Sequence, residues 1–147
     1  MKIKHISNSV LLPYQRDQVY ELVADIDSYQ EFLPWCESSR IIDSNSSSVV
    51  GEVRVGMSGV QELLVTRNTM EPHQRIGLEL LQGPFSQFQG EWLFTELGSG
   101  CKVTLDLTYQ FKNLVLHLLI SRLSEMIVNR ILHAFSDRAS AQLTPCM

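Results

Sequence analysis

The stretch that decides the fold is residues 101–142, which read CKVTLDLTYQFKNLVLHLLISRLSEMIVNRILHAFSDRASAQ. From residue 101 to residue 111, apolar and polar side chains alternate. This pattern predicts an antiparallel strand with one buried face and one face in water. The buried face would carry Cys101, Val103, Leu105, Leu107, Tyr109 and Phe111.

From residue 113 to residue 142 the repeat becomes that of a helix, because polar residues recur at every fourth position from His117 to Asp137. One continuous helix of this length would be roughly 40 Å long, enough to cross a whole sheet. Its apolar stripe would consist of Leu116, Leu119, Ile120, Leu123, Ile127, Ile131 and Phe135.

The residues before 101 predict a strand, two short helices and five more strands. Residues 2–11 alternate weakly, and RDQVYELVADI (16–26) has the apolar spacing of an amphipathic helix. Asp25 or Asp27 can cap a second short helix, SYQEF (28–32), which Pro34 prevents from continuing. After Trp35 the period is two, and strands are expected at 38–42, 47–57, 60–70, 75–81 and 84–94.

This order of elements predicts an α+β helix-grip formed by a single domain spanning residues 1–147. Six consecutive strands form an antiparallel meander, and the first strand adds to it, which gives a curved sheet of about seven strands. The apolar face of the sheet needs a cover, and the long C-terminal helix is the element able to supply it. A rod lying across a concave sheet leaves space in the middle, which predicts a ligand cavity.

Composition excludes several classes of protein. The net charge of −4 lacks the basic excess of a nucleic-acid-binding protein, so we expect no DNA partner. Three widely spaced cysteines, Cys36, Cys101 and Cys146, fit neither a disulfide framework nor a thiolate zinc site. The start has no signal-peptide core, and the longest apolar run, LVLHLLI (114–120), is about a third of a membrane span. We therefore expect a cytoplasmic protein.

Several motifs resemble one known family. They are Pro13-Tyr14, VYELVADIDSYQEFLPWC (19–36), TRN (66–68), GPFSQFQGEW (83–92) and FKN (111–113). Together they resemble the coenzyme-Q-binding family of the START-like/polyketide cyclase superfamily, whose bacterial branch includes ribosome association toxins. The similarity extends from about Lys2 to Leu143, and Phe88 stands where the family pattern has an aliphatic residue.

The resemblance implies a non-catalytic carrier or chaperone of ubiquinone or a similar isoprenoid quinone that supports respiration. The quinone would be a bound ligand, and no catalytic cofactor or metal is expected. The bacterial branch implies an alternative, a toxin-like protein that binds the large ribosomal subunit and blocks subunit association. A third alternative, an enzyme like the related cyclases, would need an acid–base pair inside the cavity, and the expected inward side chains are mostly apolar.

The expected binding site is the cavity between sheet and helix. In YQEFLPWC (29–36), Phe32, Leu33 and Trp35 either cap the core or form the cavity mouth. Gly90, between two aromatic residues, would leave room for a flat ring. Arg67 is either a solvated arginine or a buried donor to a quinone carbonyl. The expected lining consists of Phe32, Leu33, Trp35, Val55, Leu64, Arg67, Phe88, Trp92, Leu105, Leu107, Leu116, Leu119, Leu123 and Ile127.

Two further surfaces bear on partners. The run LVLHLLI is apolar on nearly every side, which suits a tunnel for an isoprenoid tail or transient contact with the inner-membrane surface. On the same predicted helix, Arg122, Arg130 and Arg138 recur every eight residues and are the basic cluster we nominate for ribosome contact.

Overall fold

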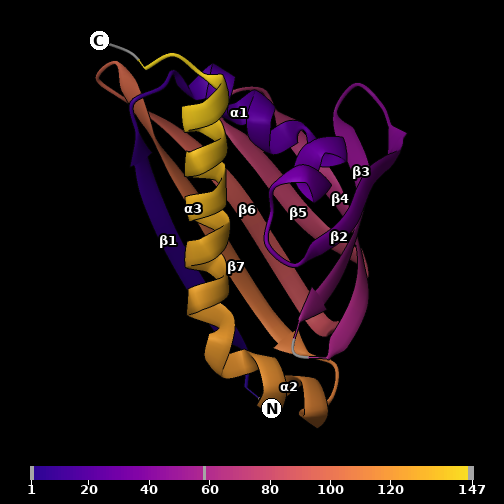
Figure 1. Ribbon diagram of the computed structural model, residues 1–147. Helices are drawn as coiled ribbons and strands as arrows, with labels where there is room; N and C mark the ends of the chain where they lie inside the picture. The colour runs from indigo at the N-terminus through magenta and orange to yellow at the C-terminus, as the bar shows by residue number, and fades with distance from the viewer. Residues whose placement is uncertain (1, 58, 146–147) are drawn as a thin grey trace.

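The structure is a computed structural model that describes residues 2–57 and 59–145 (Figure 1). It confirms the predicted α+β helix-grip with seven strands. The elements are, in chain order, β1 (Lys4–Leu12), α1 (Arg16–Ala24), the 3-10 helix η1 (Ile26–Glu31), β2 (Cys36–Ser44), β3 (Ser48–Met57), β4 (Val60–Glu71), β5 (Arg75–Gln82), β6 (Phe85–Leu97), β7 (Gly100–Phe111), α2 (Leu114–Ile120), the 3-10 helix η2 (Ser121–Leu123) and α3 (Ser124–Gln142).

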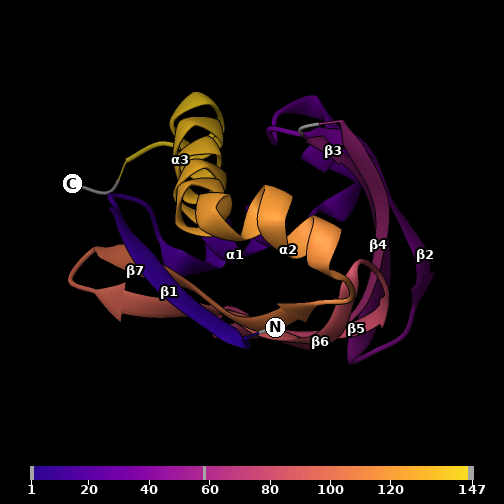
Figure 2. The same ribbon diagram turned by 90° about the horizontal axis from the view of Figure 1, so that it is seen from below.

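The seven strands form one antiparallel sheet in the order β1-β7-β6-β5-β4-β3-β2. Strands β2 to β7 are a meander, as the sequence predicted, and β1, which was expected to add to it, pairs with β7. The sheet curls so that its concave face encloses the helices (Figure 2). Register shifts within β2, at Val65 of β4 and at Phe85 of β6 assist this curvature, because a bulge bends a strand and increases its twist.

The prediction of one continuous C-terminal helix is wrong. The helix breaks at η2, and α2 turns away from the direction of α3 (Figure 2). At the break, the amide of Ser124 donates to the carbonyl of Ser121 in a 3-10 bond, and Lys4 Nζ donates to the same carbonyl at 3.0 Å. That carbonyl would otherwise accept the next α-helical hydrogen bond. The side chains of Ser121 and Ser124 are both buried at this turn.

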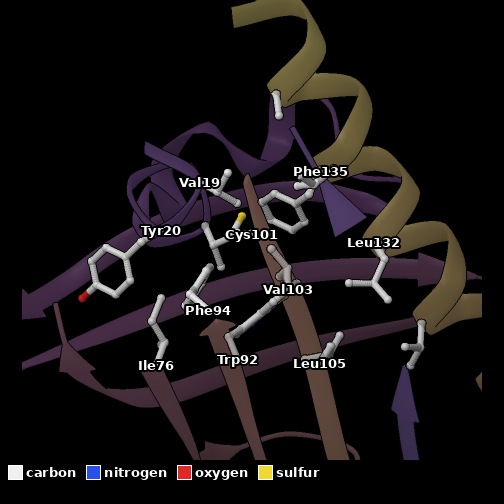
Figure 3. Close-up of a cluster of buried hydrophobic side chains, with 14 of the residues drawn as sticks. Val19, Tyr20, Ile76, Trp92, Phe94, Cys101, Val103, Leu105, Leu132 and Phe135 are labelled. Atoms are coloured by element: carbon white, nitrogen blue, oxygen red, sulfur yellow. The ribbon is translucent and has the colours of Figure 1, made fainter. Parts of the chain in front are cut away.

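The main core lies where α1 and α3 cover the sheet (Figure 3). Val19 of α1 and Phe135 of α3 converge there on Phe94 and Val103 of the sheet, and all four are at most 3% exposed. Burying side chains of this size stabilises a fold by about 1.5–3 kcal/mol each. In Figure 1, α1 and α2 lie at opposite ends of α3, so the dense core fills the α1 end of the concave face.

Within the described part of the chain, no helix combines the length and apolar character required to cross a bilayer.

Candidate functional site

A cavity of about 340 Å³ lies between the concave face of the sheet and the helices η1, α2 and α3. Its wall is formed by alternate residues of the strands, because side chains on a strand point to opposite faces in turn. On β4, for example, Leu64, Thr66 and Asn68 line the cavity. Volumes of this size fall within the range of small-molecule sites in proteins, about 300–1,000 Å³.

Ten of the fourteen residues expected in the lining lie on the cavity wall. Strand alternation placed most of them correctly, and α2 and α3 each contribute one. They are Leu33, Trp35, Val55, Leu64, Phe88, Trp92, Leu105, Leu107, Leu116 and Ile127.

Arg67 is not part of the wall, so the expectation that it lines the cavity is wrong. It lies on β4 between Thr66 and Asn68, which both face inward, and its side chain is therefore on the outer face. There its guanidinium forms an ion pair with Glu79 on β5, at 3.7 Å, and the side chain is 48% exposed. Arg67 is thus unable to donate to a ligand in the cavity.

Leu119 and Leu123 are also outside the wall. The break at η2 rotates the apolar stripe, so that Ile120, Ile127 and Ile131 face the cavity and Leu119 is 41% exposed. Both expectations depended on a single straight helix, which the chain does not form.

Phe32 is the fourth misplaced residue, and it belongs to the core. Its ring packs edge-to-face on Phe135, with 5.1 Å between ring centroids. Arg138 lies 4.9 Å from the Phe32 ring and forms an ion pair with Glu31 at 2.9 Å. Phe32 therefore anchors the η1 segment to α3, while the residues after it turn into the cavity.

Trp35 has an unusual backbone conformation. Its φ is +64°, in the left-handed region that a residue with a Cβ rarely adopts. Its carbonyl accepts a hydrogen bond from the amide of Gly56 on β3, at 3.0 Å, which fixes the turn to the sheet. Leu33, Pro34 and Trp35 line the cavity, so the YQEFLPWC segment is divided between core and cavity wall.

Gly90 does not leave space for a flat ring, contrary to expectation. A Cβ built on Gly90 would lie 2.6 Å from a methyl group of Leu107 and 3.3 Å from one of Leu78. These two leucines already occupy the space beside the glycine. Gly90 permits close packing of strands β5, β6 and β7, and Leu78 and Leu107 themselves form the cavity wall at this position.

Several polar residues on the wall were not predicted from the sequence. The hydroxyl of Tyr29 donates to the carbonyl of Val23, and the hydroxyl of Tyr109 donates to Ser124 Oγ. Burial raises the pKa of both phenols above the usual range, so both stay neutral. Tyr29 is in the YQEFLPWC motif and Tyr109 on the inward face of its strand, so alternation and motif position were the available signals.

The charged group on the wall is at the α2 end. Glu62 lines the cavity, and its carboxylate lies 3.9 Å from Nζ of Lys112. Lys112 lies two residues before the start of α2. Asn113 caps α2, because its side chain accepts a hydrogen bond from the amide of Leu116 at 2.9 Å.

Helix α2 is apolar on two sides. Leu116 and Ile120 line the cavity, whereas Leu114, Val115 and Leu118 are each more than half exposed. This seven-residue helix therefore has apolar side chains both on the cavity wall and on the outside of the molecule.

The three arginines nominated on the C-terminal helix do not form one cluster. Arg138 is held by Glu31 and Phe32, and its side chain is only 20% exposed. Arg122 lies in η2, at the break, and Arg130 lies on α3; both are exposed.

Cys36 and Cys101 form no disulfide with each other, and Cys146 lies outside the described residues.

Comparisons with known proteins agree with this fold. A family profile described as polyketide cyclase/dehydrase and lipid transport matches residues 12–136. The chain is 35% identical over 136 residues to the ribosome association toxin RatA of Pseudomonas aeruginosa, covering 92% of this chain and 94% of that protein. It is 27% identical over 138 residues to the mitochondrial coenzyme Q-binding protein COQ10 homolog B of Xenopus laevis, covering 90% of this chain and 57% of that protein.

A solved structure has the same fold. The Zhui aromatase/cyclase from Streptomyces sp. R1128 superposes with a TM-score of 0.87 at 18% identity, covering 97% of this chain and all of that chain (100%). At this identity the likeness concerns the fold alone.

Proposed function

Since the chain belongs to the polyketide cyclase/dehydrase and lipid transport family, with a START-like fold, we propose that it binds and carries an isoprenoid quinone. The observation that carries the proposal is the apolar cavity of about 340 Å³ between the sheet and the helices. Ubiquinone is the ligand class we favour, and the 27% identity with a coenzyme Q-binding protein supports it.

The cavity wall suits both parts of such a ligand. Aromatic residues Phe85, Phe88 and Trp92 offer surfaces on which a flat ring can pack, worth about 0.5–1.5 kcal/mol per stacked pair beyond burial. Aliphatic residues such as Leu107 and Ile127 offer contacts for a methylated tail. Each methylene-sized group removed from water contributes about 0.8 kcal/mol, so a short length of tail is enough for firm binding.

Binding without catalysis is part of the proposal. General acid–base chemistry needs two titratable groups directed at one reacting atom. On this wall the hydroxyls of Tyr29 and Tyr109 are used in hydrogen bonds to the protein, and Glu62 lies beside Lys112. These contacts favour a site that binds the ligand over a site that reacts with it.

We place the protein in the cytoplasm with transient contact at the inner-membrane surface. Leu114, Val115 and Leu118 of α2 would enter the interface, and Leu116 on the same helix lines the cavity. A helix that contacts both the membrane and the cavity gives the quinone a short path between them.

Tryptophan fluorescence tests quinone binding directly, because both tryptophans, Trp35 and Trp92, line the cavity. Decylubiquinone, a short-chain quinone, should quench their emission in a saturable titration. A linear response with no saturation, equal to that of free tryptophan, would reject the proposal.

Ribosome association is the second candidate function, and the 35% identity with a ribosome association toxin favours it. With a net charge of −4, contact with the large subunit would use local groups such as Arg122 and Arg130, since broad attraction to RNA is unfavourable. Sedimentation with purified large subunits at physiological salt should show co-migration, reduced in the double variant Arg122→Glu/Arg130→Glu. Absence of the wild-type protein from the subunit fractions would eliminate this candidate.

A further inference from the structure

Asn68 is a polar residue in an apolar place. It lies on β4, opposite Val49 of β3 and Leu78 of β5, and faces the cavity. Only 5% of its surface is exposed. Asparagine is depleted in strands, and a buried amide is unfavourable unless its donors and acceptors have partners.

The oxygen of the Asn68 side-chain amide has a hydrogen-bond partner. The hydroxyl of Thr66, two residues earlier on the same face, donates to Asn68 Oδ1 at 2.7 Å. Within residues 2–57 and 59–145, Asn68 Nδ2 has no hydrogen-bond acceptor. None of the fully buried side-chain nitrogen and oxygen atoms of these residues lacks a partner, so Nδ2 is not fully buried. The two N–H groups of the amide are therefore open to the cavity.

A second buried donor on the wall is in the same condition. The indole Nε1 of Trp92, a residue that is 6% exposed, also has no acceptor within the described part of the chain. In strand register, Asn68 is opposite Leu78, which is opposite Gly90, and Trp92 follows two positions further on β6. The open donors thus belong to one region of the wall.

The position of Asn68 gives the cavity a direction. Glu62 and Lys112 mark the α2 end, and Asn68 is six residues further along β4, about 20 Å away at a rise of about 3.3 Å per residue. Gly51, opposite Thr66 on β3, approaches Ile26 of η1 there. The donors are therefore at the η1 end, remote from the exposed leucines of α2.

We propose that Asn68 is the specificity-determining residue for the ligand, and that its side-chain amide donates to a carbonyl oxygen of an otherwise apolar molecule. The ligand enters head first from the α2 end, its carbonyl-bearing ring reaches Asn68, and its tail extends back toward α2. Thr66 is a positioning residue, because its hydroxyl occupies Oδ1 and so directs the N–H groups into the cavity. This inference rests on the proposed function and adds the orientation of the ligand and the chemistry that selects it.

The test compares two ligands that share a tail: decylubiquinone, with ring carbonyls, and decylbenzene, without them. Binding is measured by fluorescence quenching for the quinone and by the shift in melting temperature for both. In Asn68→Leu the Kd for decylubiquinone should rise about tenfold, which corresponds to about 1.4 kcal/mol. The Kd for decylbenzene should be unchanged or lower. Asn68→Asp, of the same size but without N–H donors, should also weaken quinone binding.

Thr69→Val is the matched control, because Thr69 is the next residue of β4 and is exposed on the outer face. It should bind both ligands as the wild type does. Equal decylubiquinone affinity in Asn68→Leu and wild type would overturn the inference, as would an equal loss of both ligands, which indicates a damaged cavity. Wild-type protein that binds both ligands equally well would overturn this inference and leave the hydrophobic cavity intact. Wild-type protein that binds neither would overturn the proposed function as well.

Discussion

Filling the cavity with protein should abolish ligand binding without unfolding the chain. Val53 lines the cavity from β3, opposite Leu64 of β4. In Val53→Trp the indole would displace a length of tail of about five methylene-sized groups, the size of one isoprene unit. Each group is worth about 0.8 kcal/mol, so the loss approaches about 4 kcal/mol. That is close to a thousandfold increase in Kd.

The assay is thermal unfolding followed by circular dichroism, with and without decylubiquinone. At a ligand concentration about 100 times the wild-type Kd, binding should stabilise the wild type by about 2.7 kcal/mol. For a chain of this length that is a rise in melting temperature of about 5–11 °C. Val53→Trp, with its Kd about a thousandfold higher, should show a rise of less than about 1 °C at the same concentration.

Arg54→Trp is the control, since it introduces the same side chain one position along β3, on the exposed outer face. It should keep the wild-type shift. The ligand-free stability of Val53→Trp is equally informative, because overpacking a filled core costs about 1–3 kcal/mol and an indole entering empty space does not. A normal ligand shift in Val53→Trp, or a large loss of its ligand-free stability, would refute the reasoning.

Three further changes test the supports of the site. Tyr29→Phe removes the hydrogen bond to the Val23 carbonyl and should cost about 1 kcal/mol at pH 7. Because burial raises the Tyr29 pKa above its ordinary 10.0, the neutral phenol stabilises the fold below pH 10, and this contribution is lost as pH rises further. Urea unfolding at pH values on both sides of 10 should therefore show a steeper decline for wild type than for Tyr29→Phe, and equal slopes would contradict this. Arg138→Met should lower the free energy of unfolding by about 1 kcal/mol through loss of its contact with Phe32, less at high salt, and a salt-independent loss would exclude an electrostatic contribution. Trp35→Gly relieves the positive φ and should change stability by less than about 1 kcal/mol while weakening quinone binding, whereas a loss of about 3–5 kcal/mol would make Trp35 a core residue.

The sheet was predictable from the sequence because its signals are local. Alternation over residues 101–111 gave the inward face of β7, and the same rule placed Leu64 and Val55 on the wall. The meander order followed from short turns between successive strands. Where strand alternation alone decides which face of the sheet a side chain is on, the prediction and the structure agree.

The helix break was not predictable, because the side-chain contact found at the break is long-range. The polar repeat continues through residues 121–124 without interruption. The carbonyl of Ser121 is bound by Lys4, far away in the chain, and nothing near residue 121 indicates this. Leu119 and Leu123 were misplaced as a direct result.

The open donor was missed for a different reason. Arg67 is the strongest donor in TRN, but strand alternation puts it on the face opposite Thr66 and therefore outside the cavity. The informative signal was its neighbour Asn68, a residue disfavoured in strands on the face that carries Leu64. The volume of the cavity was also not predictable from the sequence, because it depends on the curvature of the sheet and on which side chains fill its concave face.

Lipid mass spectrometry on the purified protein tests the central claim most directly. Wild type and Val53→Trp would be expressed in parallel in cells that produce ubiquinone, purified without detergent and extracted with organic solvent. Our account predicts an isoprenoid quinone in the wild-type extract, in amounts comparable with the protein, and little or none with Val53→Trp. Wild-type extracts with no more apolar lipid than those of Val53→Trp would contradict it.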